Sequence, residues 1–236
     1  MSELRVALVG EGPTDGIVIK AALEIILEGN EFVLTQLQPE ESRPFNAVGT
    51  GWGGVYRWCS QAVARAGGPI RHDPLFETYD VLILHLDADV ADKNYSDAGI
   101  VDSHQDLPCA RPCPLPSATT NALRQVILRW IAEPAIPPKT VFCTPSKSTE
   151  AWVLTALYPN DLIVAGGNVE CYPSPDSRLQ GKPKAGRVVS GGKKIREAYR
   201  KRAEEISNAW PAVAAVCSEA RRFTDDVRAT IQVQQA

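Results

Sequence analysis

Short apolar runs alternate along much of the chain with longer segments in which apolar residues recur every three or four positions. The short runs predict buried β-strands at residues 4–9, 31–37, 79–86 and 139–145, with the strongest strand pattern at 79–86. The longer segments predict helices up to about residue 27, before Gly67, at 116–133 and at 148–158. We expect Thr14 or Asp15 to cap the first of these helices. Strands that alternate with helices predict an α/β fold with a mainly parallel, Toprim-like sheet flanked by helices.

Two segments lack a regular apolar pattern, and the C-terminal part of the chain has a helical one. Residues 91–116 form a long polar loop with prolines near its end, and residues 164–192 are rich in Gly, Pro, Ser and Lys and predict loop or poor order. Helical patterns at 193–210 and 211–231 predict an α-helical C-terminal tail. We therefore expect a catalytic core at 1–160, a loop region at 161–192 and C-terminal helices at 193–236 that pack on the core.

Acidic residues follow three of the four predicted strands. Glu11 and Asp15 come after the first strand, Asp87 and Asp89 after the third, and Glu150 just past the fourth. Parallel strands share one carboxyl edge, which is where open α/β folds bind ligands. Paired aspartates at a strand end repel each other unless a cation neutralises them, and their hard oxygens suit Mg²⁺ or Mn²⁺.

A simpler interpretation applies to some of these acids. Asp15 and Glu150 stand where helices begin, and acidic residues are common there because they stabilise helix N-termini. Asp92, which also follows the third strand, is expected to face solvent. Asp87 and Asp89 are less easily explained in this way, because two aspartates one residue apart at a strand end project in the same general direction.

The segments "VGEGPTDG" and "LHLDAD" together resemble a Toprim domain, the catalytic module of primases, topoisomerases and certain nucleases. In that family a Glu after the first strand and an Asp-x-Asp after the third bind Mg²⁺ for phosphoryl transfer, and these positions match Glu11, Asp87 and Asp89. Asp15, four residues after Glu11, and the Ser148–Glu150 segment "STE" further resemble the Toprim nucleases of the overcoming-lysogenization-defect (OLD) class. The motifs span about residues 5–155.

The resemblance implies a DNA nuclease with two Mg²⁺ or Mn²⁺ ions and a role in defence against mobile DNA. Asp87 and Asp89, with Asp15, would hold one ion, and Glu11 and Glu150 would hold the other with the Ser148 hydroxyl. Nucleases of that class also place a later lysine near the scissile phosphate. Lys193 and Lys194 in "SGGKKI" match it best, ahead of Lys182 and Lys184.

The chain departs from that class in one respect. Its members usually join the Toprim domain to an ABC-type ATPase, but "RVVSGGKK" lacks the glycine spacing and the Ser/Thr of a G-x-x-x-x-G-K-[ST] P-loop. We therefore expect a stand-alone Toprim protein whose partners are nucleic acid, DNA in preference to RNA, and a separate ABC/AAA-type ATPase.

Charge and composition limit the other functional classes. The net charge of −3 means that any nucleic-acid binding depends on a local basic patch or on bound cations, and basic residues near the C-terminus supply either such a patch or a solvated helix face. No apolar stretch approaches the ~18 residues of a membrane span, so we expect a cytoplasmic protein without membrane contact.

Cysteine placement argues against a zinc module. In a cytoplasmic protein the six cysteines are expected to be reduced. His104, Cys109 and Cys113 supply three zinc-ligand types in one loop, but a fourth ligand is not evident nearby and the spacing matches no common zinc module.

Three alternatives to a nuclease remain open at this stage. One is a nucleotidyl-transferring Toprim enzyme such as a primase, which would be expected to bring a more basic surface and a zinc module. Another is a non-catalytic Toprim domain that binds nucleic acid, a nucleotide or a protein partner. The third is a response-regulator-like domain with one Mg²⁺ and one phosphorylated Asp, which leaves Glu150 and the late lysines without a role.

Overall fold

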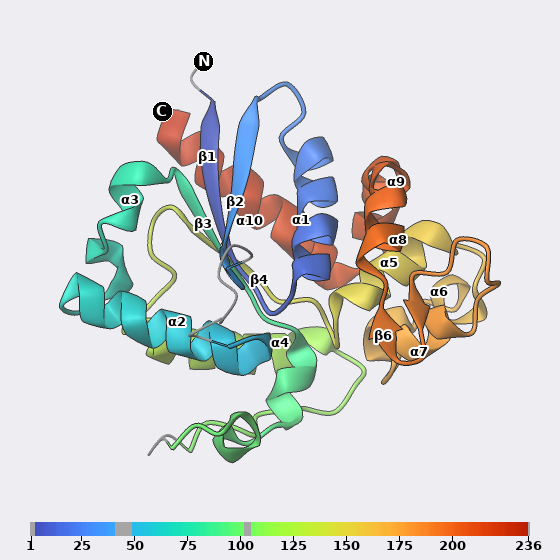
Figure 1. Cartoon of the computed structure of the whole chain (residues 1–236), viewed down its shortest axis with the longest axis horizontal. Coiled ribbons are helices and arrows are strands. Elements are labelled where there is room, and N and C mark those ends of the chain that lie inside the picture. Colours follow the sequence, from blue (N-terminus) through green and yellow to red (C-terminus); the bar gives the residue numbers. More distant parts are fainter. Residues whose placement is uncertain (1–2, 41–48, 102–104, 236) are drawn as a thin grey trace.

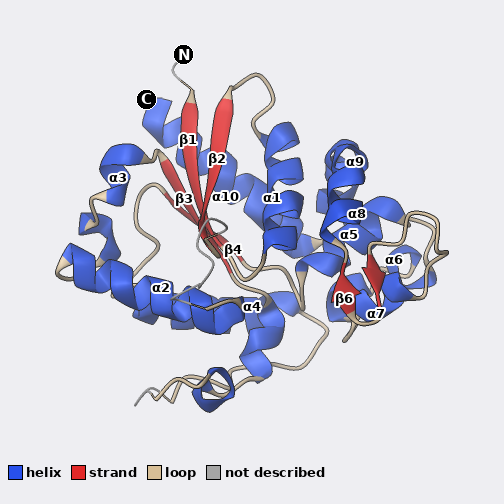
Figure 2. Cartoon of the chain, viewed as in Figure 1, coloured by secondary structure: helices blue, strands red, loops and turns tan. Residues whose placement is uncertain are grey.

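A four-stranded parallel sheet forms the centre of the molecule in the computed structural model, which describes residues 3–40, 49–101 and 105–235 (Figures 1 and 2). The strands are β1 (Leu4–Val9), β2 (Phe32–Gln38), β3 (Val81–His85) and β4 (Thr140–Cys143), in the order β2-β1-β3-β4. All three neighbouring pairs are parallel. The predicted α/β class is confirmed, and the arrangement fits a Toprim-like fold.

Helices cover both faces of this sheet because the strands are apolar on both sides. In β1, Val6 and Leu8 point to one face, while Ala7 and Val9 point to the other. The first face packs against helices α1 (Pro13–Ile26), α5 (Thr149–Leu157), α9 (Ala203–Val216) and α10 (Ser218–Gln235). The second face packs against α2 (Gly51–Ala66) and α4 (Pro116–Trp130). Two apolar cores therefore hold the strand ends in fixed positions.

Helix boundaries agree with the sequence patterns at some ends and not at others. α2 ends where expected, at Gly67, whose φ of 64° is the left-handed conformation that favours glycine. The predicted cap of α1 is wrong, since Gly12 is the N-cap and Pro13 is the first helical residue. Proline fits that position because its missing N–H has no intrahelical partner there. Asp15 therefore lies inside the first turn.

Residues 70–98 and the long polar loop contain short helical elements. η1 (Ile70–His72) and α3 (Leu75–Thr78) precede β3, and η2 (Ala88–Asp92) and η3 (Tyr95–Ala98) follow it. Tyr95 is buried, and its hydroxyl accepts a hydrogen bond of 2.8 Å from Nε1 of Trp130 in α4. This contact fixes the loop against the second core.

The prediction of loop or poor order at 164–192 is wrong. This region contains α6 (Leu162–Ala165), η4 (Val169–Cys171), α7 (Pro175–Gln180) and the strand β5 (Val189–Ser190). β5 pairs antiparallel with β6 (Lys193–Lys194). The apolar residues Leu179, Val188 and Val189 are buried in the first core, and this packing orders a segment whose composition favours loops.

The C-terminal tail is helical, as expected, but its divisions differ from the prediction. Lys193 and Lys194 lie in β6, because Gly191 and Gly192 have positive φ and make the two-residue hairpin turn. The helices that follow are α8 (Arg196–Lys201), α9 and α10. Pro211 lies inside α9 and does not begin a helix. Burial of Trp210 and Val213 on either side of it offsets the hydrogen bond that the proline removes.

None of the helices in the described part of the chain is long and apolar enough to cross a membrane.

The expectation of six reduced cysteines is wrong for one pair. Cys113, near the end of the long loop, forms a disulfide with Cys171 at the end of η4. Cys59, Cys109, Cys143 and Cys217 are free. The disulfide takes Cys113 from the candidate zinc ligands, and His104 lies outside the described residues. The disulfide links two segments that are 58 residues apart in the sequence.

We expect the disulfide to be detectable by thiol counting. Alkylation of the unfolded protein without reductant should modify four thiols, and reduction should raise the number to six. A cross-link over this sequence separation stabilises the folded state by about 4 kcal/mol through the lost entropy of the unfolded chain, so reduction should lower the melting temperature. Six reactive thiols in the unreduced protein would contradict the assignment.

Candidate functional site

Glu11 links the ends of β1 and β3. It follows Gly10 at the end of β1, is partly exposed, and its Oε1 accepts a hydrogen bond of 2.7 Å from the backbone N–H of Asp87. Register in the sheet explains the proximity, because Val9 pairs with Leu84 and the two chains leave the sheet side by side. The sequence prediction that these two residues share one edge is confirmed.

Asp87 and Asp89 follow β3 at the same edge, but their environments differ. Asp87 is buried and Asp89 is exposed, because η2 begins between them and turns the chain outward. The backbone N–H of Asp89 bonds to the carbonyl of Lys147, and this contact ties η2 to the segment before α5. We call Glu11, Asp87 and Asp89 the strand-end acids.

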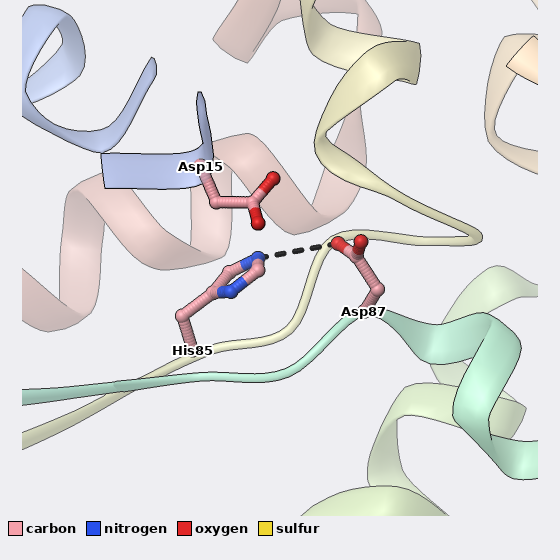
Figure 3. Close-up of side chains that lie close together, drawn as sticks. All are labelled: Asp15, His85 and Asp87. Atoms are coloured by element: carbon pink, nitrogen blue, oxygen red, sulfur yellow. Dashed lines mark hydrogen bonds and ion pairs between the residues drawn. The ribbon is translucent and has the colours of Figure 1, made fainter. Parts of the chain in front are cut away.

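His85 is a further residue of the site, and its role was not predicted from the sequence. Its ring is fully buried, and Nε2 lies 3.2 Å from Oδ1 of Asp87 (Figure 3). In Figure 3 the Asp15 carboxylate lies above the ring, near the nitrogen that contacts Asp87, and one ligand atom from each of Asp15, His85 and Asp87 lies within 4.8 Å of the others. His85 precedes Asp87 by two residues, so the period of a strand places both side chains in the same direction.

Asp15 and Glu150 come from the first turns of two helices and are both buried, at 2% and 1% exposure. Neither acts as the N-cap: Gly12 takes that position in α1 and Ser148 takes it in α5. A charged helix-start residue normally faces water, so burial of both carboxylates requires specific partners. The interpretation of these two acids as simple helix-start charges does not account for their burial.

Lys194 supplies the partner that both carboxylates need. Its Nζ lies 2.9 Å from Oε1 of Glu150 and 3.1 Å from Oδ1 of Asp15. The Tyr199 hydroxyl in α8 donates a further hydrogen bond of 2.8 Å to Oε1 of Glu150. Lys193 is exposed. The contacts of Lys194 therefore distinguish it from Lys193. We call Asp15, Glu150 and Lys194 the lysine cluster.

Thr149 connects the lysine cluster to the strand-end acids. Its hydroxyl donates to Oδ1 of Asp15 at 2.7 Å, and its backbone N–H donates to Oδ1 of Asp87 at 3.1 Å. The resemblance implies a role for the neighbouring Ser148 hydroxyl at a metal ion, whereas the described hydrogen bonds from this segment to Asp15 and Asp87 come from Thr149. The first turn of α5 therefore orients acids from both groups.

Two of the strand-end acids, Glu11 and Asp89, have pKa values shifted toward the protonated form. Burial, followed by the charge of Asp87, raises the pKa of Glu11 well above its usual value, although the hydrogen bond from the Asp87 backbone opposes the shift. Burial and the same Asp87 charge raise the pKa of Asp89 to about 6. Both shifts reflect burial first and the neighbouring negative charge second, and a bound cation would offset that charge.

The lysine cluster behaves differently because it contains its own cation. Burial favours neutral Asp15, yet Lys194 and, more weakly, His85 and Thr149 hold the pKa of Asp15 below its usual value. Burial raises the pKa of Glu150, although Lys194 opposes this. Burial disfavours the charged Lys194, but Glu150, Asp15 and Asp87 raise its pKa and keep it protonated.

The donor atoms of the strand-end acids suit a hard divalent cation. Carboxylate oxygens are the ligands that Mg²⁺ prefers, and Mn²⁺ accepts imidazole nitrogen as well as carboxylate. With the orienting hydrogen bonds to Asp87 from Thr149 and His85, the group has the second layer of contacts that metal ligands usually need. The oxygen donors of these acids therefore suit the predicted Mg²⁺ or Mn²⁺, while the described residues whose ligand atoms lie within 4.8 Å of one another are Asp15, His85 and Asp87.

A separate cavity of about 1000 Å³ lies near the opposite end of the sheet. Its lining residues, which include Leu4, Asp80 and Thr140, come from the starts of strands and from α10. It contains no acid of the two groups described above, so we do not assign the chemistry to it.

Comparison of the chain with protein-family models, with curated proteins and with solved structures finds no match. The functional assignment therefore rests on the residues of the site and on the motifs in the sequence.

Proposed function

We propose that this protein is a divalent-metal-dependent nuclease that hydrolyses DNA phosphodiester bonds at the carboxyl edge of its sheet. The observation that carries the proposal is the convergence of acids from β1, β3 and the segment after β4, held in place by Thr149 and Lys194. Four carboxylates, those of Glu11, Asp15, Asp87 and Glu150, are connected through Thr149 and Lys194. Grouping so many acids lowers the stability of a folded protein, and such groups are typical of functional sites.

The acids and lysines of the site would have distinct roles in phosphodiester hydrolysis. Glu11, Asp87 and Asp89 would hold the Mg²⁺ or Mn²⁺, while Asp15, Ser148 and Glu150 complete the ligand set in the two-ion form suggested by the resemblance. The bound metal supplies a nucleophilic water and neutralises the phosphate. Lys194 would hold the inner acids in position, and the exposed Lys193 would contact the substrate.

Local charge supports a polyanionic substrate. Residues 178–202 contain ten Lys or Arg residues and one acid, in a chain whose net charge is −3. Arg178 and Lys182 are paired with Asp161, whereas Lys184 and Lys193 are exposed. β6 lies in this segment and carries both the exposed Lys193 and Lys194 of the lysine cluster. A DNA backbone bound there would pass close to the strand-end acids.

An ATPase partner is a second part of the proposal. The resemblance to nucleases of the OLD class favours coupling to an ABC/AAA-type ATPase, and these 236 residues contain no P-loop motif that would supply the ATPase activity. Cleavage that appears only when such a partner is added would fit this arrangement.

The test of the function is incubation of the purified protein with supercoiled plasmid. We expect nicked or linear DNA in Mg²⁺ or Mn²⁺ and intact plasmid in EDTA, since the metal supplies the nucleophile. Cleavage that is equally fast in EDTA would contradict the proposal. DNA binding without cleavage in either metal, with or without an ATPase, would favour the non-catalytic Toprim alternative.

A further inference from the structure

We propose that the Lys194 ammonium takes the place of one of the two metal ions, so that the protein binds a single divalent ion, at the strand-end acids. This inference rests on the proposed function and makes its metal requirement more specific. It assigns a different role to the two halves of the acidic network: one half binds an exchangeable cation, and the other half carries a permanent one.

The contacts of Lys194 are those of a built-in cation. Its Nζ is within hydrogen-bonding distance of carboxylate oxygens from both Asp15 and Glu150, which are almost completely buried. Those are two of the carboxylates that the resemblance assigns to metal ions. A lysine that only approaches a substrate phosphate would keep its ammonium free of such partners.

The oxygens of Asp15 and Glu150 that face Lys194 are also bonded to other donors. Oδ1 of Asp15 accepts from the Thr149 hydroxyl, and Oε1 of Glu150 accepts from the Tyr199 hydroxyl. Mg²⁺ requires oxygens at about 2.0–2.1 Å, much closer than an ammonium nitrogen. A divalent ion that used these two oxygens would therefore have to displace Lys194 and draw them away from their present donors.

The hairpin holds Lys194 in this place. Lys194 pairs with Val189 across the hairpin, and the backbone N–H of Gly192 donates to Oε1 of Gln180 at 2.6 Å. Val189, which precedes Lys194 in the sequence, and Tyr199, which follows it, are both buried in the first core. These contacts fix the backbone around Lys194, so withdrawal of the ammonium would rely on its side chain alone.

The strand-end acids present the opposite situation. Within the described part of the chain, no Lys or Arg forms an ion pair with Glu11, Asp87 or Asp89. Glu11 is partly exposed and Asp89 is exposed, so an ion from solvent can reach them. One cation position is therefore accessible from solvent, and the other is occupied by the protein.

Counting bound Mn²⁺ tests the inference without measuring activity. The proteins are wild type, Lys194→Met, which keeps the length of the side chain and removes its charge, and Lys193→Met as the matched control on the same hairpin. Free Mn²⁺ is measured by electron paramagnetic resonance in a titration at constant pH, and circular dichroism checks the fold. We expect one ion per chain in wild type and in Lys193→Met, and two in Lys194→Met.

The possible counts separate this inference from the proposed function. Two ions in wild type would overturn the inference and leave the metal-dependent function standing, and this result does not depend on whether Lys194→Met folds. One ion in both wild type and a folded Lys194→Met would also overturn it. No bound ion in any of the three proteins would remove the proposed metal site and the inference together.

Discussion

Glu11→Gln should remove nearly all metal-dependent cleavage of DNA while the protein stays folded. The amide retains an oxygen that can accept the hydrogen bond from the Asp87 backbone, so the connection between the ends of β1 and β3 is kept. What it loses is the negative charge that a divalent ion requires. Residues that only support metal ligands typically change activity 10–100-fold, so loss of a ligand should lower the cleavage rate by more than about 100-fold.

The stability of Glu11→Gln is a second test, because the substitution should lower the cleavage rate without lowering the free energy of unfolding. The raised pKa of Glu11 means that folding disfavours its charged form, so a neutral side chain should not lower the free energy of unfolding at neutral pH. Glu24→Gln, an identical change at an exposed position of α1, is the control. Rates are read from plasmid gels and stability from urea unfolding. A cleavage rate in Glu11→Gln equal to that of wild type would place the chemistry elsewhere.

Glu150→Ala should cause the largest loss of stability among single changes in the site, about 3 kcal/mol. The substitution leaves Lys194 with Asp15 as its remaining partner in the cluster and takes the acceptor from the Tyr199 hydroxyl, which is bonded to Glu150 in a buried position. An acid that only favours the start of a helix would cost at most about 1 kcal/mol when removed. The expected loss therefore distinguishes a member of the lysine cluster from a helix-start charge.

Urea unfolding followed by circular dichroism measures this loss. The control is Glu197→Ala in α8, whose exposed carboxylate pairs with Arg200 and Lys201 at 3.9 Å. Exposed pairs contribute little, so this variant should change stability by less than about 0.5 kcal/mol. If Glu150→Ala lost no more than the control, Glu150 would have no structural part in the cluster.

The sheet could be predicted because its strands are buried on both faces. A continuous apolar run as short as that of β3, bounded by turn residues, is typical of a strand in a parallel sheet and too short for most helices. The segment 164–192 could not be predicted, since its many glycines and prolines conceal five buried apolar positions that only the tertiary packing reveals. The prediction that a helix begins at Pro211 failed for a related reason. Contacts between α9 and other elements keep that helix continuous through the proline.

Candidate site residues were predictable where the chain supplies them directly after a strand. Glu11 and Asp87 meet because parallel strands end together, which sequence order alone implies. Lys194 was predicted only as one of two adjacent lysines. Selection between them required the register of the β5–β6 hairpin, which pairs Val189 with Lys194.

Thr149 and His85 were missed for different reasons. Thr149 stands between Ser148 and Glu150, the two residues of the Ser-x-Glu motif. The sequence alone does not show which of two adjacent hydroxyl residues at a helix start contacts the acids. His85 looked like the end of an apolar strand, yet its spacing of two residues from Asp87 was a usable signal. The disulfide between Cys113 and Cys171 was missed because scattered cysteines carry no pairing information.

The central claim is that the strand-end acids bind the divalent ion on which the chemistry depends. Thermal unfolding of wild type and of Asp87→Ala/Asp89→Ala, each with EDTA or with saturating Mn²⁺, tests it most directly. At 100 times its dissociation constant, an ion that binds only the folded state adds about 2.7 kcal/mol and so raises the melting temperature. We predict this rise in wild type and none in the double variant. An equal Mn²⁺-induced rise in the folded double variant would contradict the account.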